Sequence, residues 1–199
     1  MTTGNPDGES PACTERRAMH RYRTVYRVAK VARGADAGLW RVRNISDNGI
    51  MLLTSVAPAI GERLSIALSE KVALMGTVKW RDGERCGVAF DTPIDCAALL
   101  KGLAAERQAE TYRPPRLAIS TGAIAHAGGR ATPVRVVNMS QHGIAFAHGG
   151  GFEAGMRVKL LFDGGTERHG IVRWSSAGKA GLALSEPFAC ADLESAARF

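Results

Sequence analysis

The feature that most constrains the fold is an internal repeat. At a shift of 94 residues, the 199-residue chain aligns with itself without a gap. The identical pairs include Asn44/Asn138, Ser46/Ser140, Gly49/Gly143, Ile50/Ile144, Gly76/Gly170, Trp80/Trp174, Gly87/Gly181 and Cys96/Cys190. Because glycines and a tryptophan do not coincide at this density by chance, the shift predicts two copies of one domain. We expect a disordered tail over residues 1–14, a first copy with its linker over 15–110, and a second copy over 111–199.

The apolar pattern within each copy has a period of two, which is typical of half-buried β-strands. In the first copy it predicts six short strands, near residues 22–31, 38–45, 49–56, 63–69, 72–81 and 85–90. Strands this short are stable only in a closed or sandwiched sheet. The expected fold class is therefore mainly all-β, with two small six-stranded antiparallel barrels, each followed by a short helix.

A helix is expected within residues 94–110, after the last strand of the first copy. Thr92 is the predicted N-cap, with Pro93 at the first helical position and Asp95 completing a capping box. The apolar residues Leu99, Leu100 and Leu103 follow at helical spacing, so this helix should cover an end or edge of the first barrel. Residues 189–198 are expected to form a shorter counterpart after the second barrel.

Positive charge is concentrated near the N-terminus. Residues 16–43 hold nine Lys or Arg and one acid, Asp36, whereas the whole chain has a formal charge of +7. The rest of the chain is therefore close to neutral. This distribution favours one anionic ligand site over a surface that is basic all round.

Other classes of protein are disfavoured by what the sequence lacks. No run of 18 apolar residues occurs and the start has no signal-peptide pattern, so we expect no membrane span and a cytoplasmic location. The four cysteines form no CxxC pair and have no suitably spaced histidine, so we expect free thiols and no metal site. No nucleophile, base and orienting group recur at catalytic spacing, and we expect no enzyme activity and no cofactor.

Two short motifs in the first copy carry the functional hypothesis. Arg17 and Arg21 lie four residues apart before the first strand, about 13 Å from each other in an extended chain. The stretch Asn44-Ile-Ser46-Asp-Asn-Gly49 follows at the end of the second strand. Arginine offers a planar fork of donors for phosphate oxygens or guanine acceptors, and Asn44 and Ser46 add an amide and a hydroxyl on one side of the strand. Asn48 and Gly49 are expected to take the positive φ of a tight turn.

At these residues the sequence resembles the PilZ domain family, whose marks are an RxxxR stretch and a later [D/N]xSxxG stretch. The resemblance covers residues 15 to about 95. It implies a six-stranded barrel that binds the bacterial second messenger cyclic di-GMP and has no catalytic activity. It also implies that Arg17 and Arg21 bind guanine edges and phosphates, while Asn44, Ser46 and Gly49 line the opposite wall of the ligand site.

The arginine stretch is extended by Arg16, and an RRxxxR pattern in this family often accompanies binding of two stacked ligand molecules, so the resemblance leaves one or two molecules open. A receptor of this kind should couple ligand binding in the first barrel to a change in domain arrangement or in binding of a protein partner. The sequence does not identify that partner.

The second copy keeps one motif and departs from the other. Asn138, Ser140 and Gly143 repeat the pattern, whereas Arg113 and Arg116 are three apart and separated by two prolines. These five residues are therefore at most a weak second site.

Two other hypotheses remain open. A small-barrel protein that binds single-stranded nucleic acid fits the charge, but such barrels stack bases on exposed aromatics. Trp80 and Trp174 lie on the apolar face of their strands and are expected in the core. Only Tyr22 and Tyr26 accompany the arginines, so nucleic acid is the less favoured partner. The third hypothesis is an interaction adaptor with a PilZ-like fold that binds no ligand.

Overall fold

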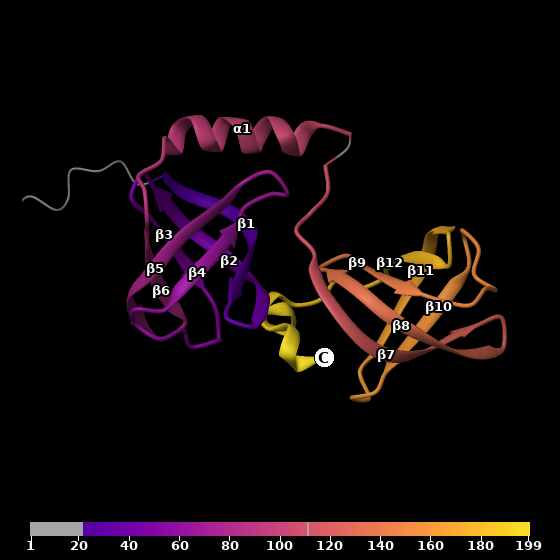
Figure 1. The fold of residues 1–199 in the computed structure, drawn as a ribbon. Helices are drawn as coiled ribbons and strands as arrows, with labels where there is room; N and C mark the ends of the chain where they lie inside the picture. The colour runs from indigo at the N-terminus through magenta and orange to yellow at the C-terminus, as the bar shows by residue number, and fades with distance from the viewer. Residues whose placement is uncertain (1–21, 111) are drawn as a thin grey trace, which may run out of the picture.

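The structure is a computed structural model that describes residues 22–110 and 112–199. It contains two closed β-barrels of six strands each, side by side, with the helix α1 (Cys96–Gln108) along the first barrel (Figure 1). The first barrel consists of β1 (Tyr22–Arg33), β2 (Asp36–Ser46), β3 (Gly49–Leu53), β4 (Arg63–Ala67), β5 (Ala73–Asp82) and β6 (Arg85–Phe90). The second consists of β7 (Leu117–Ala127), β8 (Arg130–Ser140), β9 (Gly143–Ala147), β10 (Arg157–Phe162), β11 (Glu167–Ser176) and β12 (Lys179–Leu184).

Both barrels have one topology. In the first, the strand order is β1-β2-β3-β6-β5-β4, and β1 closes the sheet on β4. The second repeats this order with strands β7 to β12, and every neighbouring pair is antiparallel. Closure leaves no open sheet edge, which is how strands as short as five residues are kept stable. The predicted fold class is confirmed, while residues 1–14, expected to be a disordered tail, lie outside the described residues.

The duplication extends to the irregularities of the strands. A register shift between Val42 and Asn44 in the first barrel recurs between Val136 and Asn138 in the second. Another, between Val78 and Trp80, recurs 94 residues later on β11. Because a bulge re-aims the side chains that follow it, both copies present their polar motif from the same backbone irregularity.

The helix α1 lies within the expected range, but its predicted cap is wrong. The N-cap is Asp95, whose side chain accepts a hydrogen bond from the Ala98 N–H at 2.9 Å. The preceding Ile94 N–H donates to the Asp47 carbonyl at 2.8 Å, so Thr92 and Pro93 stay outside the helix, in an irregular segment held by the β2–β3 turn. The expected apolar stripe is confirmed, since Leu103 is buried and its neighbours one turn earlier pack on the first-barrel core.

The second barrel is followed by two short 3₁₀ helices instead of an α-helix. They are η1 (Cys190–Leu193) and η2 (Ala196–Arg198). Figure 1 shows this segment in yellow between the two barrels, next to β2.

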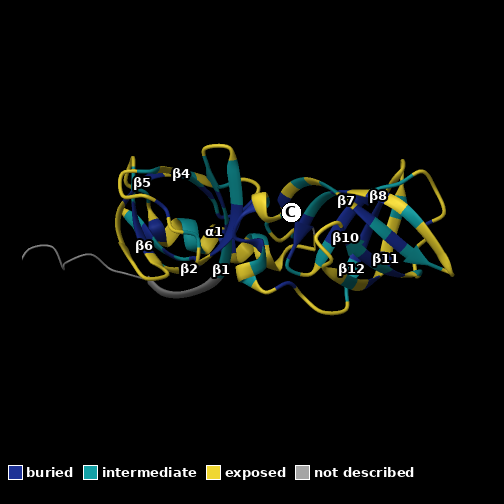
Figure 2. Cartoon of the chain, turned by 90° about the horizontal axis from the view of Figure 1, so that it is seen from below, coloured by how far each residue is buried: buried dark blue, intermediate teal, exposed yellow. Residues whose placement is uncertain are grey.

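Each barrel encloses its own apolar core (Figure 2), and one buried residue of the first barrel, Leu39, belongs to the core of the second, with the half-buried Val28 and Ala37 packed against it. On β2, Trp40 points into the first barrel, whereas Leu39 packs with Leu117 and Leu193 of the second. Consecutive strand residues point to opposite faces, so two fully buried neighbours mean that both faces of β2 are covered here.

Two side chains expected in the core are on the surface. Trp80 and Trp174 are 41% and 42% exposed. Each indole lies on a glycine of the neighbouring strand, because a Cβ at Gly87 or Gly181 would overlap the indole nitrogen. The bulge that precedes each tryptophan moves its side chain to the other face of the strand. The period of two, which assumes a regular strand, therefore predicted the wrong face.

The cysteines that the structure describes are free thiols, as expected. Cys86 is fully buried, and burial raises the pKa of its thiol to about 11. The thiolate is the reactive form, so this cysteine is a packing residue.

Candidate functional site

The candidate site is built on the β2–β3 hairpin, which presents Asn44 and Ser46 on one face. Between them Ile45 points into the barrel and is buried, while both polar residues are half-buried. The Ser46 hydroxyl donates to the Gly49 carbonyl at 3.3 Å, and the Asn44 amide nitrogen lies 3.9 Å from Met51 Sδ. Both side chains therefore stand on the same outer face of a short, well-paired hairpin, as the spacing predicted.

Gly49 is needed for a different reason from the one expected. Neither Asn48 nor Gly49 has a positive φ. A Cβ at Gly49 would instead lie 2.5 Å from the carbonyl oxygen of Val88 on β6. The glycine permits close approach of β3 to its neighbour, and this holds the hairpin against the barrel.

The turn between the two strands is tied to the segment that leads into α1. The Asp47 carboxylate accepts from the Cys96 N–H at 3.0 Å, and its carbonyl accepts from Ile94. The Asn48 carbonyl accepts from the Phe90 N–H at 2.9 Å. A displacement of this hairpin would therefore pull on the first turn of α1.

The three arginines predicted to bind the ligand, Arg16, Arg17 and Arg21, lie outside the described residues. The described backbone begins with Tyr22, which pairs with Ile45, followed by Arg23, which pairs with Asn44. The chain thus enters β1 directly beside the motif. Whether the arginine side chains reach Asn44 and Ser46 stays a prediction.

Some of the basic residues after this point have structural roles. Arg33 pairs with Glu62 at 2.8 Å. Arg27 donates from Nη2 to the Leu103 carbonyl on α1 at 3.0 Å, and its Nη1 is buried without a hydrogen-bond partner among the described residues. By contrast, Arg41 and Arg43 are exposed on β2. Sequence reasoning counted all of these as ligand-attracting charge, because nothing in the pattern distinguishes a strand arginine that supports a helix.

The second copy reproduces the hairpin. The Ser140 hydroxyl donates to the Gly143 carbonyl at 3.3 Å, as in the first copy. Ser140 is buried, however, whereas Ser46 is half-buried. Asn138 occupies the position equivalent to Asn44, after the same bulge.

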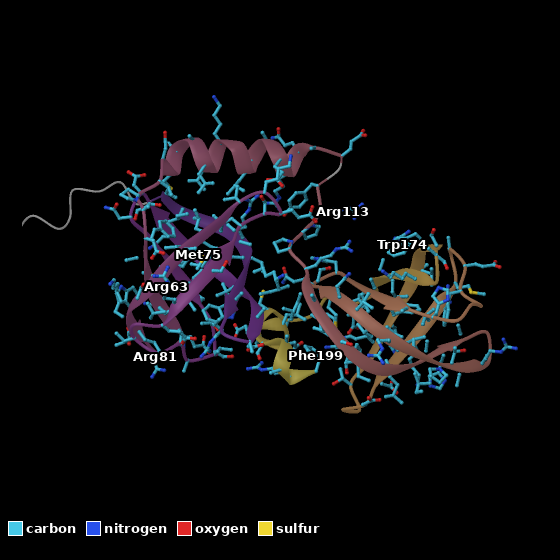
Figure 3. The ribbon with its side chains drawn as sticks, viewed as in Figure 1. Arg63, Met75, Arg81, Arg113, Trp174 and Phe199 are labelled. Atoms are coloured by element: carbon cyan, nitrogen blue, oxygen red, sulfur yellow. The ribbon has the colours of Figure 1, made fainter. Side chains whose placement is uncertain are left out.

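The two arginines of the second copy lie in different surroundings. Arg116 immediately precedes β7, whose first residues pair with the Asn138–Met139 stretch. Arg113 lies on the linker (Figure 3) and lines a cavity of about 720 Å³ together with α1 and the β4–β5 turn of the first barrel. The structure therefore leaves one arginine near the second motif and directs the other to the first barrel.

Among residues 22–110 and 112–199, no group of three or more His, Cys, Asp or Glu could hold a metal ion. No helix in these ranges is long and apolar enough to cross a membrane.

Comparison with known proteins identifies the first repeat. The family model described as "PilZ domain" matches residues 15–104. A search of curated protein sequences found no significant match.

Solved structures with a similar fold are distant. The PlzA protein of Borreliella burgdorferi in complex with cyclic di-GMP is 12% identical, with a TM-score of 0.37 over 79% of this chain and 80% of that chain. The Bacillus subtilis inhibitor of motility MotI/DgrA is 13% identical, with a TM-score of 0.33 over 83% and 90%. The Klebsiella MrkH complex with cyclic di-GMP is 9% identical, with a TM-score of 0.33 over 80% and 79%. Similarity at this level carries no argument about residues or ligands, so the comparison rests on the family model, and residues 15–104 match the PilZ domain family.

Proposed function

We propose that the first barrel is a receptor for cyclic di-GMP, with no catalytic activity. The observation that carries the proposal is that the PilZ match coincides with a hairpin whose outer face presents Asn44 and Ser46. This hairpin stands beside the point where the arginine stretch joins β1, since Arg21 directly precedes Tyr22 in the chain.

The proposed site divides its work between two kinds of group. Arg17 and Arg21 supply charge-assisted forks to the phosphates and guanine edges of a dianionic ligand. Asn44 and Ser46 supply neutral hydrogen bonds from a surface that the barrel holds in place. Gly49 keeps that surface close to β6, and Arg16 would contact a second, stacked ligand molecule.

The test is isothermal titration calorimetry with cyclic di-GMP on the full chain. A charge-assisted hydrogen bond contributes about 1.5–3 kcal/mol, so Arg21→Ala should weaken binding by about tenfold or more. Arg116→Ala is the matched control, because this arginine precedes the first strand of the second barrel. Unchanged affinity in Arg21→Ala, or an equal loss in Arg116→Ala, would contradict the proposed site.

The serines give a second matched pair. Ser46 and Ser140 make the same 3.3 Å bond in their own hairpins, so either change to alanine removes the same internal contact. We expect Ser46→Ala to weaken ligand binding and Ser140→Ala to leave it unchanged. The same comparison tests whether Arg113, Arg116, Asn138, Ser140 and Gly143 form a weak second site.

We further propose that ligand binding is transmitted from the hairpin to the rest of the chain. The bonds from Asp47 to residues 94 and 96 connect the site to α1, and α1 leads to the second barrel. A ligand that draws Asn44 and Ser46 toward the arginines would displace the hairpin and strain these hydrogen bonds to the start of α1. A protein partner would then bind one arrangement of the two barrels in preference to the other.

A second candidate function is favoured by the exposed tryptophans. Trp80 lies between the exposed cations Lys79 and Arg81, and Trp174 follows exposed Arg173. Exposed aromatics among cations suit single-stranded nucleic acid, which binds by stacking and by backbone neutralisation. Salt-dependent binding of a thymidine oligonucleotide that is lost in Trp80→Ala would support this function. Absence of binding at low salt would exclude it.

A further inference from the structure

The C-terminal residues 190–199 form a bridge from the second barrel to strand β2 of the first (Figure 1). At the centre of the bridge, the Trp40 indole Nε1 donates to the carbonyl oxygen of Glu194 at 2.9 Å. A Cβ at Gly38 would overlap this same carbonyl oxygen. The first barrel thus offers both a donor and a space without a side chain to one peptide group of the second repeat.

The side chain of Glu194 makes a second set of contacts. Its carboxylate accepts from the backbone N–H of Ser55 at 2.6 Å and from the Ser55 hydroxyl at 2.5 Å. Glu194 is only 3% exposed. Because a buried carboxylate is costly unless it is hydrogen-bonded, separation of the barrels would leave its two Ser55 bonds unmade.

A carboxylate of the first barrel repeats the arrangement in the opposite direction. Asp36 accepts from the Ser195 hydroxyl at 2.7 Å and from the backbone N–H groups of Ala196 and Ala197 at 3.0 and 3.3 Å. Ala196 and Ala197 begin η2, and their N–H groups have no acceptor within that short helix, although the Ala197 N–H also donates to the Ser195 hydroxyl at 3.2 Å. Each barrel therefore supplies a carboxylate to donors of the other.

Apolar contacts fix the bridge on both sides. Leu39, on the outer face of β2, is 1% exposed and packs in one cluster with Leu193. The Phe199 ring lies 6.1 Å from that of Phe162 and 6.3 Å from that of Phe188, within the second repeat. Figure 3 shows Phe199 between the two barrels.

The bridge is also attached to the second copy of the sequence motif. The Gln141 carbonyl accepts from the Phe188 N–H at 2.8 Å, and the Gln141 amide lies 3.0 Å from Cys190 Sγ. In the first copy the carbonyl of the equivalent residue, Asp47, likewise accepts from the Ile94 N–H, but its carboxylate accepts from the Cys96 N–H instead of donating to a thiol. The turn of each motif therefore positions the segment that leaves its barrel.

From these contacts we propose that residues 190–199 are an intramolecular latch that fixes the two barrels in one arrangement. The turn of residues 138–143 positions this latch. The repeated motif in the second copy thus serves the domain interface. The latch closes on the start of β2, and the other end of this strand carries Asn44 and Ser46, so barrel arrangement and ligand-site geometry share one strand. The proposal does not depend on which ligand the first barrel binds.

The test compares Gly38→Ala with Gly102→Ala in the full chain. The first substitution places a methyl group on the Glu194 carbonyl, whereas a Cβ at Gly102 meets nothing within 4 Å. We expect amide hydrogen exchange at Ser55, Ala196 and Ala197 to become about tenfold faster in Gly38→Ala, as loss of charge-assisted bonds predicts. The radius of gyration from small-angle scattering should increase, and exchange in the barrel cores should stay unchanged. The control should resemble wild type.

Unchanged exchange at these three amides and an unchanged radius of gyration in Gly38→Ala would overturn the latch. If this variant lost protection in the core of the first barrel, Asp36→Ala would decide by the same two measurements, because its carboxylate faces the bridge. Gln141→Ala tests the anchor separately. Roughly two- to fivefold faster exchange at Ala196 and Ala197 supports it, and wild-type exchange there would contradict the role of the 138–143 turn.

Discussion

Asp36 is one of two carboxylates that join the barrels, and its environment makes the contact sensitive to acid. Burial raises the pKa of this carboxyl, but hydrogen bonds from the Ser195 hydroxyl and from three backbone N–H groups more than offset this effect. The net result is a pKa below the ordinary value of about 3.9. A lowered pKa in the folded state means that the ionised carboxylate stabilises the contact.

The contribution of Asp36 is complete above the ordinary carboxyl pKa and is lost as the pH falls through the lowered one. Exchange at Ala196, corrected for its intrinsic rate, should therefore accelerate as the pH is lowered below about 4. Arg33 and Glu62 line the adjoining cavity, so Glu62→Gln is the control variant, in which the nearby Glu62 carboxylate is removed and Asp36 is kept. An identical acid response in Asp36→Asn would show that another group is responsible.

A second residue-scale prediction concerns the glycine beneath each exposed tryptophan. Gly87→Ala would place a Cβ inside the Trp80 indole and force that side chain to move. We expect a loss of about 1–3 kcal/mol in the free energy of unfolding, the usual cost of overpacking. Urea unfolding measures it, with Gly102→Ala as a control that should be neutral or stabilising by up to about 1 kcal/mol. Equal stability of the two variants would mean that the indole contact is not rigid.

At the scale of elements, the connection between hairpin and helix can be cut at one side chain. Asp47→Ala removes the acceptor of the Cys96 N–H at the start of α1. We expect a loss of about 1 kcal/mol, seen as roughly fivefold faster amide exchange in the first turn of α1. Gln141→Ala is the equivalent change in the second copy and should leave α1 unaffected. Wild-type exchange in α1 of Asp47→Ala would remove the proposed route from site to helix.

The 94-residue repeat and the apolar period of two predicted the strands of both barrels well, because both patterns reflect a barrel in which every strand has an inner and an outer face. They failed where a bulge shifts the faces, as at Trp80 and Trp174, and where tertiary contact overrides a local signal, as when Asp47 holds Ile94 and displaces the cap to Asp95.

For the candidate site, Asn44 and Ser46 lie together as expected, whereas the role of Gly49 follows from contact with Val88 on a strand distant in sequence. The interface escaped prediction, although Leu39 and Trp40 in succession are a signal that both faces of a strand are covered.

At the scale of the whole molecule, two buried leucines of the first barrel distinguish folding of a domain from assembly of the pair. Leu39 and Leu52 are 1% and 0% exposed, but Leu52 lies in the first core and Leu39 lies in the cluster shared with the second repeat. Leu52→Ala should destabilise the first barrel by about 2–5 kcal/mol, the typical cost of a cavity in a core. Leu39→Ala should instead loosen the contact between the barrels, because its side chain points away from the first core. We expect its radius of gyration to increase while the first barrel keeps its unfolding midpoint in urea. A large shift of that midpoint in Leu39→Ala, with no change in scattering, would show that the outer face of β2 stabilises its own barrel and that the two repeats are joined elsewhere.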